Sequence, residues 1–582
     1  MSADARARDN HAAEIGASFD VVVVGAGFAG LYMLHRLRGL GFRVRVYEAG
    51  GGVGGTWYWN RYPGARCDVE SMQYSFSFSE DLDQQWDWSE KYAPQPEILA
   101  YANHVADRFD LRRDIRFDTR VTAATFDETA RRWRIETDRG DTVSAQFCIM
   151  AVGCLSATNR PPFEGLETFE GPIYHTGEWP HDGADFTGLR VGVIGTGSSA
   201  IQSIPIIARQ ASALTVFQRT ATYTVPAWNE TLTPEYRAAI KADYPALRAK
   251  ARARPTGFYF PFNMKPALEA TPEDRERQYE EAWQRGGLPF LGAYGDLLFD
   301  KEANDTIAEF ARRKIRGIVK DPATAALLCP DNVFGCKRLC VDTGYFETYN
   351  LPHVRLVDVS KTPIERFTPR GIAVNGVEYP VDAIVCATGF AAMTGSFDRI
   401  RITGRNGLTL AEKWQAGPRT YLGLATVGFP NLFTITGPGS PSVLASMIQA
   451  IEQHVDWLAD CIGHLRDIGA ASIEPIDRYE DDWVAHVNEV SQVSLRSTCS
   501  SWYVGANIPG RPRVFMPYIG GFPVYVQKCN EVMSNGFEGF VIDGAKSTND
   551  APRVRLTERW RVPLDIEVIS PAAIAARRVP VV

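Results

Sequence analysis

The amino-acid sequence predicts an α/β fold with two parallel-sheet domains and a helical insertion in the second. Two β-branched runs, residues 19–24 and 189–194, each lead into a glycine-rich turn and an apolar stretch of helical period, as expected of a buried parallel strand and its crossover helix. Between residues 228 and 331 the sequence becomes charged and helical in pattern. There, residues 271–274 (TPED) supply the cap, proline and acids of a helix start.

The first strand leads into the sequence GAGFAG at residues 25–30. Glycines at these spacings allow a tight turn, a close approach of the backbone to a pyrophosphate, and close packing of helix on strand. A second strand, residues 43–48, ends in an acid where a carboxylate can accept hydrogen bonds from a ribose. The alternative is a purely structural glycine turn. The residues predicted to bind a dinucleotide in this first Rossmann-like domain are Gly25, Gly27, Gly30 and Glu48.

The same pattern recurs at residues 195–200 (GTGSSA), but its second strand, residues 214–219, ends in an arginine. A carboxylate at this position suits a free ribose hydroxyl, whereas a guanidinium suits a 2′-phosphate. We therefore expect FAD in the first domain and NADPH, rather than NADH, in the second Rossmann-like domain. A solvated charge at the strand end is the alternative for the arginine. The residues predicted here are Gly195, Thr196, Gly197, Ser198, Ser199 and Arg219.

Two dinucleotide sites in one chain indicate electron transfer from a nicotinamide to a flavin. Residues 381–389, an apolar strand ending in ATG, resemble the segment by which two-dinucleotide flavoproteins return from the NADPH domain to the FAD domain. Both domains are therefore expected to be discontinuous in sequence. The expected order is a disordered N-terminus (1–18), the first segment of the FAD-binding domain (19–160), the linker with the first segment of the NADPH-binding domain (161–227), the helical insertion (228–331), the second segment of the NADPH-binding domain (332–385), the second segment of the FAD-binding domain (386–544) with an active-site loop near 495–515, and a C-terminal extension (545–582).

Composition excludes several classes of function. The net charge of −7 gives no support to nucleic-acid binding. No apolar run approaches the roughly 20 residues of a membrane span, and the polar N-terminus lacks a signal-peptide core, so we expect a cytoplasmic protein. In the C-terminal extension, residues 554–556 and 566–568 could form strands, but no function is assigned to them.

The ten cysteines lack a dense framework, and we expect them to be free thiols. Cys329, Cys336 and Cys340 come nearest to a cluster, but without paired CxxC spacing or a nearby histidine they predict no metal site. A disulfide reductase would need two cysteines beside the flavin, whereas the segment after the first Rossmann unit contains only Cys67.

Two longer motifs carry a family resemblance. Residues 169–180 (FEGPIYHTGEWP) match FxGxxxHxxxWP, and residues 54–68 match GGxWxxxxYPGxxxD. Over residues 19–544 the chain resembles the Baeyer–Villiger monooxygenases, which are class B flavoprotein monooxygenases, and most of all the phenylacetone and steroid monooxygenase group. The resemblance implies FAD contacts at Gly55, Thr56, Trp57, Tyr62 and Asp68, and a linker signature of Phe169, Gly171, His175 and Trp179 that couples the two domains.

The resemblance also implies the residues of the reaction. Arg338 would stabilise the negatively charged oxygen species, and Asp68 would orient it. Lys337 and Thr220 would join the arginine of the second motif at the 2′-phosphate of NADPH. Trp502, in the segment SWYVGANIPG at residues 501–510, would close over the cofactor and substrate. From the residues alone, the Lys-Arg pair could be a surface doublet, His175 an ordinary histidine, and the glycine-rich segment a plain loop.

The function implied is an NADPH-dependent FAD monooxygenase that converts a ketone, whether cyclic, aromatic or steroid-like, into an ester or lactone with O2 through a C4a-peroxyflavin. No membrane, nucleic acid or obligate protein partner is expected. The alternative is a flavin-containing monooxygenase that oxidises nitrogen or sulfur, or an N-hydroxylase; the Trp179-Pro180 pair and the Arg338 segment count against it. A flavin-binding protein without catalysis would need a broken site, whereas the site motifs are intact.

Overall fold

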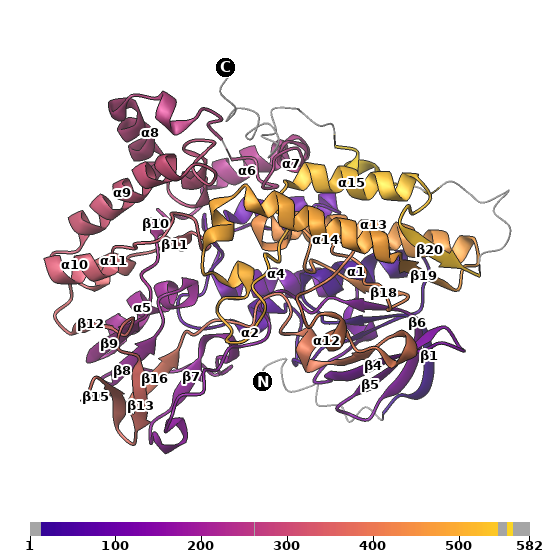
Figure 1. Cartoon of the computed structure of the whole chain (residues 1–582), viewed down its shortest axis with the longest axis horizontal. Coiled ribbons are helices and arrows are strands. Elements are labelled where there is room, and N and C mark those ends of the chain that lie inside the picture. The colour runs from indigo at the N-terminus through magenta and orange to yellow at the C-terminus, as the bar shows by residue number, and fades with distance from the viewer. Residues whose placement is uncertain (1–12, 261, 545–553, 555, 563–582) are drawn as a thin grey trace.

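The computed structural model describes residues 13–260, 262–544, 554 and 556–562. Two large sheets lie in different halves of the molecule, with helices packed around each (Figure 1). The first is mixed, because β5 runs antiparallel to β4 and β6, and the second is wholly parallel. The α/β class with two Rossmann-like domains is therefore confirmed.

The first sheet has eight strands in the order β17-β4-β5-β6-β1-β2-β3, and β18 pairs with β6. Its strands come from two distant regions of the chain, because β17 and β18 follow the whole second sheet in sequence. The C-terminal part of β1, residues 21–24, is buried on both faces, which accounts for its unbroken run of valines. The bounds are β1 Ile15–Val24, β2 Val44–Tyr47, β3 Ile115–Arg116, β4 Val121–Asp127, β5 Arg132–Thr137, β6 Thr142–Met150, β17 Arg401–Thr403 and β18 Leu432–Thr434.

The second sheet has five strands in the order β12-β9-β8-β16-β7, all parallel. A small antiparallel sheet, β13-β14-β15, lies between β12 and β16 in the chain. The bounds are β7 Ile173–His175, β8 Arg190–Ile194, β9 Ala213–Gln218, β12 Val354–Asp358, β13 Ile364–Thr368, β14 Gly371–Val374, β15 Val377–Pro380 and β16 Ala383–Cys386.

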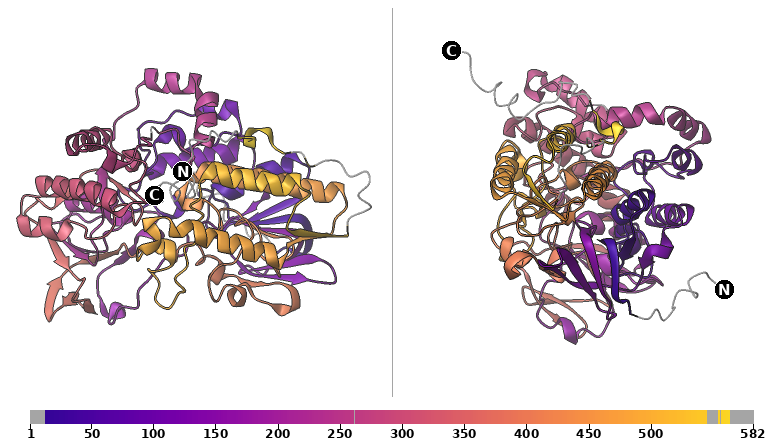
Figure 2. Two further views of the ribbon diagram at one scale, coloured as in Figure 1. Left: turned by 45° about the horizontal axis from the view of Figure 1, so that its top comes forward. Right: turned by 90° about the vertical axis from the view of Figure 1, so that its right-hand side faces the viewer.

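Each glycine turn is followed by a helix. Helix α1 (Phe28–Gly39) follows β1, and α5 (Ser198–Gln210) follows β8. Helix α1 packs against α13 (Met447–Asp467), so the C-terminal region of the chain covers the first domain. In both views of Figure 2 the orange and yellow C-terminal helices run beside this sheet. The other elements of this half include α2 Thr56–Trp59, α3 Glu80–Gln85, α4 Gln95–Arg108, α12 Leu410–Lys413, α14 Asp477–Gln492, α15 Phe522–Ser534, β19 Ser472–Pro475 and β20 Phe540–Asp543.

The helical segment expected within the NADPH domain divides between the two halves. Its N-terminal stretch packs on the first domain, where Tyr244 and Phe258 join the core and Arg248 pairs with Asp83 at 3.1 Å. Its C-terminal stretch forms a separate core with residues of β10 and β11. The helix start predicted at residues 271–274 is confirmed, because the Thr271 side chain accepts a hydrogen bond from Asp274 N. The bounds are α6 Pro234–Ala242, α7 Tyr244–Arg252, α8 Pro272–Arg285, α9 Lys301–Ile318, α10 Pro322–Leu328, α11 Tyr345–Thr348, β10 Thr224–Pro226 and β11 Cys340–Asp342.

The chain ends differ from the sequence expectation. Strand β1 begins at Ile15, inside the segment expected to be disordered, because the backbone there pairs with β6 and Glu14 binds Arg45. At the other end, Val554 and Leu556, which could have been the ends of a strand, lie in no strand and pack on the first core. The second possible strand, residues 566–568, and residues 1–12 lie outside the described residues.

The expectation that all ten cysteines are free is wrong. Cys336 and Cys499 form a disulfide across 163 residues of sequence, and the other eight cysteines are free. The fold brings the pair together from two different segments, and no local spacing signals it. Over the described ranges of the chain, none of the helices has the length and apolar character needed to cross a membrane.

Candidate active site

A cavity of about 1650 Å³ is lined by residues from both domains. It includes both glycine turns, the Lys-Arg pair and the loop after α14. The predicted residues that line it are Gly25, Gly27, Glu48, Gly55, Thr56, Trp57, Tyr62, Asp68, Gly195, Thr196, Gly197, Ser198, Ser199, Arg219, Thr220, Lys337, Arg338 and Trp502. Gly30 and the linker signature residues Phe169, Gly171, His175 and Trp179 do not line it.

The first glycine turn is built for close backbone approach. A Cβ atom at Gly30 would lie 1.9 Å from the carbonyl oxygen of Gly25, so only glycine lets α1 pack against the turn. Gly27 immediately precedes α1, whose N-terminal N–H groups therefore face the cavity. A helix N-terminus that opens onto a cavity stabilises an anion such as a pyrophosphate.

Glu48 holds the loop around this turn. It is buried, and its carboxylate accepts hydrogen bonds from Ala26 N at 2.7 Å and Gly50 N at 2.8 Å. Burial raises the pKa of Glu48, and these N–H donors oppose that shift. The carboxylate thus anchors the loop and also lines the cavity where a ribose is expected.

The second glycine turn repeats the first in detail. Gly195 N donates to Phe217 O at 3.0 Å, as Gly25 N donates to Tyr47 O at 2.8 Å. Gly195 has φ of +111°, and a Cβ atom there would lie 2.5 Å from Ala387 O. Ala387 begins the ATG turn at residues 387–389, so this turn packs directly against the second glycine motif.

Two cations lie together beside the second turn. Arg219 is exposed, and Lys337 is half-buried. Burial lowers the pKa of Lys337, and the charge of Arg219 lowers it further. Neither side chain has a carboxylate partner among the described residues. Thr196 donates to Thr220 O at 2.7 Å and so fixes the adjacent backbone. Two unpaired neighbouring cations form a site suited to a phosphate.

Arg338 is held in the cavity wall by groups from two other segments. Its Nε and Nη2 donate to the two Asp68 carboxylate oxygens at 2.5 and 2.8 Å, and Nη1 donates to Val443 O at 2.9 Å. Burial alone would lower the pKa of Arg338, but the Asp68 carboxylate more than offsets this and raises it. The guanidinium is therefore charged and fixed in direction.

The segment that carries Asp68 also joins the two domains. Tyr62 OH donates to Gln202 Oε1 on α5 at 2.8 Å. Gly64 lies against the same helix, since a Cβ atom there would be 2.2 Å from Gln202 O. Trp57 is buried beside the cavity, and its Nε1 donates to Tyr74 OH at 3.1 Å.

His175 lies in the linker between the domains, away from the cavity wall. Its Nδ1 accepts from Gly177 N at 3.1 Å, and its Nε2 lies 3.2 Å from both Asn159 O and Thr388 Oγ1. Burial lowers the pKa of His175, which favours the neutral ring. The side chain thus fastens residue 159 to the ATG turn. Of the other signature residues, Trp179 and Phe169 are buried in the cores around the second sheet, and Gly171 packs closely on Asp382.

Trp502 is half-buried at the cavity, in a loop that bonds to residues 390–398. Its ring lies 4.2 Å from that of Tyr503. Asn507 Nδ2 donates to Phe390 O at 2.6 Å, and Arg511 pairs with Asp398. The loop therefore rests against the segment that follows the ATG turn.

Sequence reasoning missed three features here: the disulfide, the Val443 carbonyl that binds Arg338, and the half-buried Arg496 near that arginine. All three depend on contacts between distant segments and have no local sequence signal. No group of three or more His, Cys, Asp or Glu side chains in the described ranges is arranged to hold a metal ion.

Comparisons with known proteins place this geometry in a family. A family model described as pyridine nucleotide-disulphide oxidoreductase matches residues 22–251. A Baeyer–Villiger monooxygenase of Pseudooceanicola batsensis is 42% identical over 536 residues, which is 91% of this chain and 97% of that protein.

The chain belongs to the Baeyer–Villiger monooxygenase family.

Two further proteins extend this result. The structure of oxidised steroid monooxygenase bound to NADP aligns with a TM-score of 0.87 and 56% identity, covering 90% of this chain and 99% of that one. A phenazine N-monooxygenase of Lysobacter antibioticus is 40% identical over 534 residues, 91% of this chain and 98% of that protein. This Baeyer–Villiger monooxygenase is thus an NADPH-dependent FAD enzyme that converts a ketone into an ester or lactone.

The residues present fit both cofactors. The first turn offers close backbone approach and a helix N-terminus, and the second adds two unpaired cations for a 2′-phosphate. Solved structures in the same family hold FAD and NADP together.

Proposed function

We propose that Arg338 and Asp68 are the catalytic pair of this monooxygenase. The proposal rests on the bidentate hydrogen bond between these two side chains. The pair lies in the wall of the cavity that both glycine turns line. Because its direction is fixed before reaction, the Arg338 guanidinium stabilises negative charge on oxygen without reorganisation. Asp68 holds Arg338 in place and offsets its charge.

The cofactors divide between the two turns. FAD would contact Gly25, Gly27, Glu48 and the segment at residues 55–68, and its chemistry, once NADPH has reduced it, is the reaction with O2. NADPH would lie along residues 195–199, with its 2′-phosphate on Arg219, Thr220 and Lys337. The unpaired charge of these two cations supports NADPH over NADH.

The loop at residues 495–515 would exclude water when it closes. Trp502 lines the cavity and is half-buried, so movement of this one side chain changes access to the site. Exclusion of water strengthens the interaction of Arg338 with a developing negative charge.

The substrate is proposed to be an apolar ketone of cyclic, aromatic or steroid-like form. The lining of the cavity includes the apolar side chains of Phe258, Val443, Ala445 and Met447. Apolar side chains beside one fixed guanidinium suit a ligand with a single polar oxygen. The similarity to steroid monooxygenase supports the same class.

We further propose that the enzyme acts in the cytoplasm, where NADPH is supplied, and without an obligate protein partner. The second point rests on one observation: the glycine turns, the catalytic pair and the loop all come from a single chain.

Replacement of Arg338 tests the proposed role. Arg338→Ala should retain FAD and still be reduced by NADPH, whereas ester formation falls by about 100- to 1000-fold, the usual effect of losing such stabilisation. Arg190→Ala is the matched control, because Arg190 makes the same kind of bidentate pair with Asp382 on the surface. Full ester yield from Arg338→Ala would overturn the assignment.

Nitrogen oxidation is the second candidate function, favoured by the similarity to phenazine N-monooxygenase. Transfer of oxygen to a nitrogen nucleophile needs no cation to stabilise a ketone-derived alkoxide. Arg338→Ala should therefore spare oxidation of a phenazine-type heterocycle if that is the natural reaction. If Arg338→Ala loses both ester formation and N-oxidation, the result favours the ketone reaction as the natural one.

A further inference from the structure

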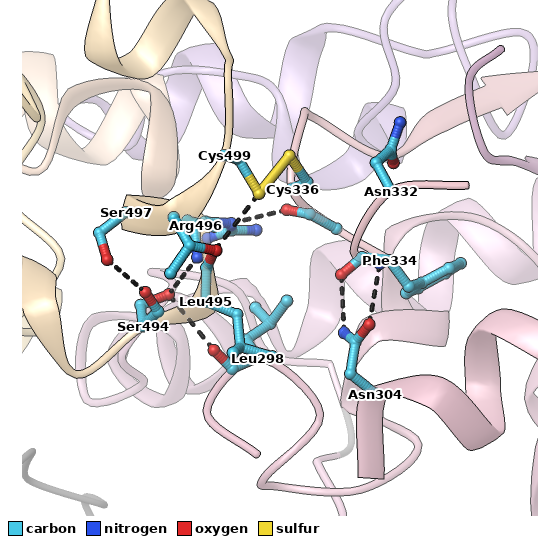
Figure 3. The surroundings of a disulfide bond; sticks show 12 residues. Leu298, Asn304, Asn332, Phe334, Cys336, Ser494, Leu495, Arg496, Ser497 and Cys499 are labelled. Atoms are coloured by element: carbon cyan, nitrogen blue, oxygen red, sulfur yellow. Dashed lines mark hydrogen bonds between the residues drawn. A yellow bond between two sulfur atoms is a disulfide. The ribbon is translucent and has the colours of Figure 1, made fainter. Parts of the chain in front are cut away.

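The disulfide joins two elements of the site that are far apart in sequence. Cys336 directly precedes Lys337 and Arg338, and Cys499 lies three residues before Trp502. Their Cα atoms are 5.9 Å apart, and Figure 3 shows the bond between the two chain segments. The bond therefore fixes the loop to the segment that carries the catalytic arginine.

On the arginine side, the segment is anchored from within the helical region. Asn304 on α9 is fully buried, donates to Phe334 O at 2.9 Å and accepts from Phe334 N at 2.9 Å. These two bonds, drawn in Figure 3, hold the backbone just before Gly335 and Cys336. The disulfide therefore attaches the loop to a segment that is itself anchored to α9.

Apart from the disulfide, hydrogen bonds to backbone carbonyls hold the start of the loop against the neighbouring segments. Arg496 Nε donates to Gly335 O at 2.9 Å, and Leu495 N donates to Leu298 O at 2.9 Å (Figure 3). Both of these hydrogen bonds can break without a chemical reaction. A covalent link at the same place changes how readily the loop leaves the segment.

Cys499 is the more accessible of the two cysteines, because Cys336 is only 3% exposed. Cys336 and Cys499 line the cavity, and Cys499 is half-buried rather than enclosed. Two cations lie near the pair in the chain: Lys337 directly follows Cys336, and Arg496 lies three residues before Cys499. Cys67 and Cys154 also line the cavity, but burial raises the pKa of both thiols, so they stay protonated.

We propose that Cys336 and Cys499 form a redox-modification site that controls opening of the loop over the cavity. The oxidant is hydrogen peroxide, which forms when reduced flavin transfers its two electrons to O2 without oxygenating a substrate. One thiolate attacks the peroxide and becomes a sulfenic acid with release of hydroxide. The second thiol attacks that sulfur and releases water, so that two thiols and one peroxide give one disulfide and two waters. A dithiol reverses the reaction and is itself oxidised to a disulfide.

The consequence is feedback on wasted turnover. Peroxide produced without a substrate would close the loop, which slows exchange of the nicotinamide cofactor and further consumption of NADPH. The inference rests on the proposed role of the loop, and reduction of the pair restores opening.

The first test maps the thiols in the FAD-bound enzyme. After treatment with hydrogen peroxide or with dithiothreitol, free thiols are alkylated and located by mass spectrometry. Cys336 and Cys499 should be alkylated only after reduction, whereas Cys67 and Cys154 should not change. Alkylation of both residues in the peroxide-treated enzyme would overturn the proposal.

The second test measures release of NADP⁺ by stopped-flow absorbance of the bound flavin. The oxidised enzyme should release NADP⁺ at least about fivefold more slowly than the reduced enzyme, the lower range of ordinary coupling between sites. The double variant Cys336→Ser/Cys499→Ser should match the reduced enzyme under both conditions, and Cys329→Ser, a control outside the cavity, should match the unaltered chain. Equal release rates for oxidised and reduced enzyme contradict the proposal without any variant. Neither test requires ketone oxygenation, so failure of the reaction assignment gives a different result.

Discussion

Replacing Arg219 by alanine should weaken the use of NADPH and leave NADH unaffected. A hydrogen bond to a charged group contributes about 1.5–3 kcal/mol. Because Arg219 is exposed, solvent screening places it near the lower value, about a factor of ten in affinity. Lys337 is half-buried, so its replacement should cost near the upper value, about a factor of one hundred.

Steady-state kinetics with each cofactor measures this difference. KM for NADPH should rise about tenfold in Arg219→Ala and more in the double variant with Lys337→Ala, while KM for NADH stays within error. Arg190→Ala serves as the control for loss of a surface guanidinium. If KM for NADH rises by the same factor as KM for NADPH, Arg219 does not bind the 2′-phosphate.

Three further changes have defined outcomes. Gly195→Ala places a Cβ atom 2.5 Å from Ala387 O and should abolish NADP⁺ binding, measured by titration, while FAD stays bound. Asn304→Ala leaves both backbone groups of Phe334 without their partner and should lower the free energy of unfolding by about 2–4 kcal/mol in urea. Burial lowers the pKa of His454 to about 3 from 6.5. The unfolded chain therefore binds a proton below pH 6.5 that the folded chain does not. Stability should fall by about 1.4 kcal/mol per pH unit there. His454→Asn should remove that contribution to the slope; an unchanged slope would contradict it.

The sequence predicted the features of the site that depend on local geometry. Glycine spacing reports a turn whose close contacts, such as Gly30 on Gly25 O, lie within a few residues. The prediction of FAD or NADPH from Glu48 or Arg219 is also local, because each residue ends the strand that follows its own glycine motif. The Arg338–Asp68 pair spans 270 residues and was accessible only through the family resemblance, not through spacing.

Other features needed the fold. Tyr244 and Phe258 belong to the segment expected as an insertion in the NADPH domain, but they pack on the core of the first domain. The C-terminal extension contributes Arg559 and Trp560, whose side chains bind the buried Asp456 of α13, and a polar sequence gives no sign of that partner. Tertiary contacts between distant segments decide such positions, and local patterns do not encode them.

Oxygen-18 labelling is the decisive test of ketone oxygenation in this cavity. The FAD-bound enzyme is given NADPH, a cyclic ketone and oxygen-18 gas, and the product is analysed by mass spectrometry. We expect a lactone that carries one heavy oxygen atom for each NADPH consumed, with little hydrogen peroxide. Stoichiometric hydrogen peroxide with no labelled lactone from any ketone tested would refute the assignment of this cavity to ketone oxygenation.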